Sequence, residues 1–88
     1  MNKKNNKLEL TNWTYEALIN LGGKAKLAEV AREIWENHES DLRSSGDQFY
    51  TWQYDMRWCA QKLRDDGYFM SNNKTERGYW EINREISN

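Results

Sequence analysis

The chain has 88 residues, a single cysteine and a formal net charge of −1. This length allows one small domain whose core is just large enough to fold without a metal or a disulfide, and a lone Cys59 excludes a disulfide framework within the chain. A charge near zero argues against indiscriminate binding of nucleic acid, so any such binding must depend on a local arrangement of cations.

Hydropathy and aromatic content narrow the class of protein further. No apolar run approaches the length of a membrane span, and the first residues lack the apolar segment of a signal peptide, so we expect a cytoplasmic, intracellular protein. Five tryptophans and five tyrosines exceed what a small core needs. We therefore expect some aromatic rings on the surface, where they would act as contact groups.

The first half of the chain predicts a helix, a short strand and a second helix. A domain over residues 10–83 is expected between a disordered tail at 1–9 and a frayed end at 84–88. Thr11 or Asn12 is expected to cap the first helix, and Gly22-Gly23 to end it. Residues 24–26 are predicted as a strand, and apolar spacing predicts the second helix from about residue 27 to residue 37.

The second half predicts a connection, a third helix and two strands. Residues 38–48 form a polar connection in which Leu42 is the one strong apolar anchor. The third helix has an apolar face for the core (Phe49, Trp52, Met56, Cys59, Ala60 and Leu63) beside a polar and aromatic one (Tyr50, Gln53, Tyr54, Arg57, Gln61 and Arg64). It stops at Asp66-Gly67, and strands at 68–70 and 79–82 flank a polar loop at 71–78.

This order of elements is typical of a winged helix-turn-helix, in which a helix ends at a glycine and continues into a β-hairpin called the wing. The fold class is therefore expected to be α+β, with three helices and a small antiparallel sheet. His38 is expected to cap or pack, because no nucleophile, carboxylate pair or metal-ligand spacing surrounds it. No catalytic residue, metal or cofactor is expected.

A family resemblance supports the same fold. The residues that carry it are Leu21-Gly22-Gly23, Asp41-Leu42, Ser45-Gly46, Phe49, Trp58-Cys59, Leu63-Arg64-Asp65-Asp66-Gly67-Tyr68 and Arg77-Gly78-Tyr79-Trp80. Over residues 10–82 they resemble the winged-helix domain at the amino end of Mrr-type restriction endonucleases. The runs Leu63-Arg64-Asp65-Asp66-Gly67-Tyr68 and Arg77-Gly78-Tyr79 also resemble parts of the winged helices fused to methyladenine-dependent restriction enzymes. The resemblance implies a DNA-binding module of a restriction system. The nuclease carboxylates and lysine are missing here, so the chain is expected to be either an excised reader domain, with a fused or associated nuclease domain as partner, or a small free-standing protein.

The third helix is the element expected to enter the major groove of double-stranded DNA, where each base pair has its own pattern of donors and acceptors. Gln53 or Gln61 would pair with adenine and Arg57 with guanine. Cations in the loop and before the helix would contact phosphates. The expected DNA contacts are Arg43, Ser45, Tyr50, Thr51, Trp52, Gln53, Tyr54, Arg57, Trp58, Gln61, Lys74 and Arg77.

Trp58 has two alternative placements. We expect it to pack on the wing strands near Trp80. If it is instead exposed beside Tyr54, the two rings form an apolar recess for the methyl group of a methylated base. The resemblance favours N6-methyladenine as that base.

Two other functions remain open beside the methylated-DNA reader. A protein-interaction winged helix would use Tyr54, Trp58 and Trp80 as an apolar docking patch. A transcriptional regulator without modification preference would form a stable dimer on a palindromic site. For individual polar residues of the third helix, a merely solvated helix face is the simpler alternative.

Overall fold

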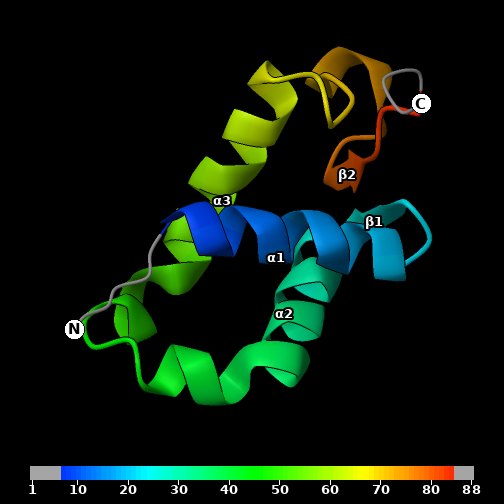
Figure 1. The fold of residues 1–88 in the computed structure, drawn as a ribbon. Coiled ribbons are helices and arrows are strands. Elements are labelled where there is room, and N and C mark those ends of the chain that lie inside the picture. Colours follow the sequence, from blue (N-terminus) through cyan, green and yellow to red (C-terminus); the bar gives the residue numbers. More distant parts are fainter. Residues whose placement is uncertain (1–6, 85–88) are drawn as a thin grey trace.

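The computed structural model describes residues 7–84 as three helices and a two-stranded antiparallel sheet (Figure 1). The elements in chain order are α1 (Lys7–Asn20), β1 (Lys24–Lys26), α2 (Leu27–Arg43), α3 (Gln48–Asp65), the 3-10 turn η1 (Asn72–Lys74) and β2 (Tyr79–Glu81). The α+β class and the three helices are therefore as predicted. No helix in the described part of the chain is both long and apolar enough to cross a membrane.

Helix α1 begins at Lys7, so the predicted cap at Thr11 or Asn12 is wrong. The reason is that Leu10 belongs to the core and is held there by the first turns of the helix. The end of α1 is as predicted: the amides of Gly22 and Gly23 donate to Ile19 and Leu18, and Gly22 has a φ of 97°. This is the glycine-dependent Schellman pattern. The predicted tails lie mostly outside the described residues, within which 7–9 are helical.

Helix α2 runs six residues beyond its predicted end and absorbs half of the predicted connection at 38–48. Its backbone departs from helical geometry at His38, with φ −134° and ψ 22°. The imidazole stacks on Trp13 of α1 with the ring centroids 4.0 Å apart, so His38 packs as expected. The bend allows the last turn of α2 to deliver Leu42 to the core, where it is buried. Burial of Leu42 offsets the poor helix propensity of the surrounding polar residues.

Helix α3 ends as predicted. The amides of Gly67 and Tyr68 donate to the carbonyls of Arg64 and Leu63 at 3.1 and 2.8 Å, and Gly67 has a φ of 90°. This is a second Schellman pattern, and it turns the chain directly from α3 toward the sheet.

The sheet confirms two of the three predicted strands. β1 pairs with β2 in the register Lys24↔Glu81, Ala25↔Trp80 and Lys26↔Tyr79. Residues 68–70 do not form a regular strand. They pair with the residue that follows β2 through a single bridge between Phe69 and Ile82, flanked by two backbone hydrogen bonds.

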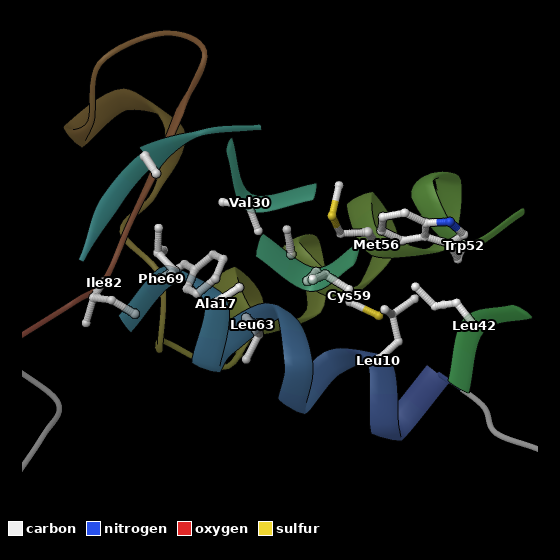
Figure 2. Packing of buried hydrophobic residues seen from close by; sticks show 14 residues of the cluster. Leu10, Ala17, Val30, Leu42, Trp52, Met56, Cys59, Leu63, Phe69 and Ile82 are labelled. Carbon is white, nitrogen blue, oxygen red and sulfur yellow. The ribbon is translucent and has the colours of Figure 1, made fainter. Parts of the chain in front are cut away.

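The core is one continuous strip of apolar side chains (Figure 2). It runs from Phe69 and Ile82 at the sheet to Leu42 and Trp52 near the connection between α2 and α3. Helix α1 lies across α3 and supplies Leu10, Ala17 and Leu18 to this strip. Because five residues of α3 are buried on one side, the opposite side of that helix faces solvent.

Candidate nucleic-acid interface

The solvent face of α3 carries two of the most exposed aromatic side chains in the described part of the chain. Tyr50 is 82% exposed and Tyr54 is 76% exposed, and they lie one helical turn apart. Gln53, Arg57 and Gln61 are also exposed on this side of the helix. The sequence pattern predicted this division of α3 into a core face and an outer face, except that Phe49, expected on the core face, is only partly buried.

Hydrogen bonding divides the two glutamines that were predicted to contact adenine. The Gln61 amide nitrogen donates to Asp65 Oδ1, and its oxygen accepts from Arg64 Nη1, both at 2.8 Å. By contrast, Gln53 has no side-chain hydrogen bond to any residue in the range 7–84. The amide of Gln53 is therefore available to a ligand, whereas that of Gln61 is already engaged by its own helix.

Arg57 is the free cation of this face. It is exposed, and it forms no ion pair or hydrogen bond with a residue that the structure describes. Lys62, a second cation of α3, is by contrast ion-paired, with its Nζ 3.6 Å from Asp66 Oδ2. Thr51 is also engaged, because its hydroxyl donates to Asp55 at 3.1 Å. Gln53 and Arg57 are thus two unengaged polar groups, separated by one turn of helix and flanked by the two exposed tyrosines.

The two predicted tryptophan contacts are less exposed than the two tyrosines. Trp52 is only 5% exposed and its ring stacks at 6.2 Å from Trp35, so its side chain belongs to the core. Trp58 is 47% exposed and lines a groove with residues of α1 and Tyr68. Tyr68 belongs to the predicted wing segment at 68–70, whereas Trp80 packs against Phe69 with the ring centroids 6.1 Å apart. Packing of Trp58 near Trp80 stays a prediction.

The two predicted contact residues before α3 form hydrogen bonds with nearby residues of α2. Arg43 Nε donates to Glu39 Oε2 at 2.7 Å, and the guanidinium lies over the rings of Trp35 and Phe49. The Ser45 hydroxyl donates to the carbonyl of Leu42 at 2.6 Å. Both residues stabilise the entry to α3, and a role in phosphate contact would require these bonds to be shared or exchanged.

The loop at 71–78 carries the remaining predicted cations. Lys74 and Arg77 are both exposed, and neither forms an ion pair within the described range. The loop follows α3 in the chain after the turn at Gly67 and the segment 68–70 (Figure 1).

The sheet carries two exposed cations that are already engaged with other side chains and that the sequence analysis did not single out. Lys24 and Lys26 have their ammonium groups 5.2 and 5.9 Å from the centroid of the Tyr79 ring, and Lys24 also pairs with Glu76 at 3.3 Å. The signal was present in the alternation Lys-Ala-Lys, which places both lysines on one face of a strand.

The described residues offer no metal site. Among residues 7–84 there is no group of three or more histidine, cysteine or carboxylate side chains placed to hold a metal ion.

Comparison with known proteins identified no relative of this chain. No family model, curated protein or solved structure matches the chain.

Proposed function

We propose that this chain is a winged-helix module that binds double-stranded DNA without catalysing a reaction. The order of three helices, with a strand before α2 and a hairpin-like segment after α3, supports this proposal. Helix α3 would lie in the major groove, with the loop at 71–78 beside the phosphates. The hairpin is small, since residues 68–70 contribute one bridge.

The observation that carries the proposal is the pair of unengaged groups on α3. Gln53 can donate to and accept from adenine, and Arg57 can donate two hydrogen bonds to guanine. Each such contact discriminates between bases by about 1–3 kcal/mol. A purely solvating helix face rarely carries Tyr50 and Tyr54 as well, because an exposed ring leaves apolar area in water.

The same tyrosines favour a modified base as the target, and we propose N6-methyladenine. A methyl group in the major groove would be covered by a ring of Tyr50 or Tyr54 while Gln53 contacts the base. Covering one methyl contributes about 0.8 kcal/mol, so two methyls in a symmetric site would be needed for strong preference. The resemblance to winged helices of methyladenine-dependent restriction enzymes points the same way. In such a system a fused or associated nuclease domain would act on the DNA that this module selects.

A protein-docking module is the second candidate, and one observation favours it. Tyr50, Tyr54 and Trp58 follow one another at four-residue intervals along α3 and are all exposed, while the net charge of −1 supplies little general attraction to DNA. A transcriptional regulator without modification preference is the third.

Salt dependence of duplex binding separates these functions. About four phosphate contacts would give a slope near −4 in a plot of log affinity against log salt concentration, whereas an apolar protein contact would change little with salt. Arg57→Ala is the informative variant, and Lys24→Ala is its control because it removes the same charge from the sheet. We expect Arg57→Ala to lower affinity by at least about fivefold, equivalent to about 1 kcal/mol. Equal effects of the two variants would contradict docking through α3.

A further inference from the structure

A groove between α1 and α3 forms a second candidate site, separate from the pair Gln53 and Arg57. It has a volume of about 470 Å³, within the range of sites that hold small molecules. Its walls come from Asn12 and Tyr15 on α1, Trp58 and Leu63 on α3, and Tyr68 just after α3. The Schellman turn at Gly67 places Tyr68 beside the two helices, so the groove depends on the stop signal that the sequence predicts.

Three aromatic side chains line this groove. The rings of Tyr15 and Tyr68 meet edge to face, with centroids 5.8 Å apart and an interplanar angle of 79°. Trp58 is 47% exposed and Tyr68 is 44% exposed, so large ring surfaces remain open to a ligand. Leu63 is buried and closes the groove from the core side. A planar ring could therefore stack within the groove, as unpaired nucleobases do on aromatic side chains.

The polar groups at the rim favour a neutral ring with both donors and acceptors. Asn12 is exposed, and its amide has no hydrogen-bond partner among residues 7–84. An asparagine amide pairs with the amino group and ring nitrogen of adenine. A cationic ligand, which aromatic rings can also hold, is disfavoured here. Asp66 is already paired with Lys62 at 3.6 Å, and the Lys62 ammonium would repel a second cation.

We propose that this groove binds an unstacked purine base, with the ring against Trp58 and its edge on the Asn12 amide. The base belongs either to a free mononucleotide or to an unpaired position in DNA. The inference does not require that α3 bind duplex DNA, because no group invoked here is Gln53 or Arg57. It explains why Trp58 and Tyr68 are exposed, although exposure of their rings to water is unfavourable in free energy.

The test is an NMR titration of the whole chain with adenosine monophosphate, following the side-chain amide of Asn12 and the indole N–H of Trp58. We expect both signals to shift, and Asn12→Ala to weaken binding by at least about fivefold, as loss of a bidentate base contact does. Asn72→Ala is the matched control, since it removes an exposed asparagine amide from the loop. Gln53→Ala should leave this titration unchanged, which separates the inference from the proposed function.

Three further probes make the outcome decisive. Ribose 5-phosphate lacks the base and should cause no shift; equal shifts would overturn base recognition. Tetramethylammonium should also be silent, and strong shifts with it would indicate a cation cage instead. A duplex with one bulged adenine, compared with the same duplex without the bulge, distinguishes the sources. Shifts of the Asn12 and Trp58 signals with the bulged duplex alone indicate DNA, and shifts with the mononucleotide alone indicate a free nucleotide. No response to either would refute the proposal.

Discussion

Substituting Gln53 and Gln61 separately by alanine distinguishes an engaged side chain from an available one on the same helix. Both glutamines are exposed on α3, and both were predicted from the sequence as adenine contacts. In the structure only Gln61 is held, through 2.8 Å hydrogen bonds with Asp65 and Arg64. The two substitutions are chemically identical, so differences in DNA binding reflect position and not the kind of atom removed.

The expected magnitudes follow from these contacts. Loss of a bidentate contact from Gln53 to adenine costs about 1–3 kcal/mol of binding free energy, or about 5- to 150-fold in Kd. Gln61→Ala removes only hydrogen bonds between exposed side chains, and surface changes of this kind usually alter the free energy of unfolding by about 0.5 kcal/mol or less. We expect it to change Kd by less than about twofold, well below the cost of a lost base contact.

Fluorescence anisotropy with a labelled duplex measures both variants, and thermal unfolding by circular dichroism checks that each remains folded. An equal loss of affinity in both variants would refute the reasoning, because it would mean that Gln61 leaves Asp65 and Arg64 to bind DNA. No loss in either variant would remove α3 amides from the interface altogether.

Three predictions concern the fold. Met56→Ala, at a buried position of α3, should lower the free energy of unfolding by about 2–5 kcal/mol, measured by urea denaturation. Leu42→Ala should lower the free energy of unfolding by a similar amount, because the bent end of α2 buries this side chain. Ser40→Ala, at an exposed position two residues earlier, is the control and should have little effect. Equal stability of the two variants would contradict the extension of α2. Gly22→Ala and Gly23→Ala should each cost about 1–2 kcal/mol, since both residues have φ values near 97° that alanine adopts poorly; an unchanged melting temperature would argue against this turn.

The ends of two helices and the position of the first strand could be predicted from the sequence, because their causes are local. Gly22 and Gly67 end helices through positive φ values that glycine alone adopts readily, and Lys-Ala-Lys alternates with the period of a strand. Helix limits set by distant partners could not be predicted. Thr11 is a good cap by type, yet the helix continues back to Lys7 because Leu10 packs in the core.

The candidate sites also depend on contacts that the sequence alone could not predict. Periodicity placed Gln53 and Gln61 on the outer face of α3, but only side-chain geometry shows that Gln61 is engaged. Trp58 illustrates the point further. The sequence places it off the main core face, while its position in the groove depends on how α1 crosses α3 and where the turn at Gly67 puts Tyr68.

The most direct test of the proposed function is a titration of the protein against one short duplex panel at fixed moderate salt. The panel contains adenine within GATC and in other contexts, each unmodified, hemimethylated and fully methylated at N6. At about 0.8 kcal/mol for each covered methyl, we predict about fourfold tighter binding per methyl and about 15-fold for two. Equal affinity for all duplexes would contradict modification reading and leave an ordinary DNA-binding module. Absence of binding to every duplex would contradict the DNA-binding proposal and favour a protein partner.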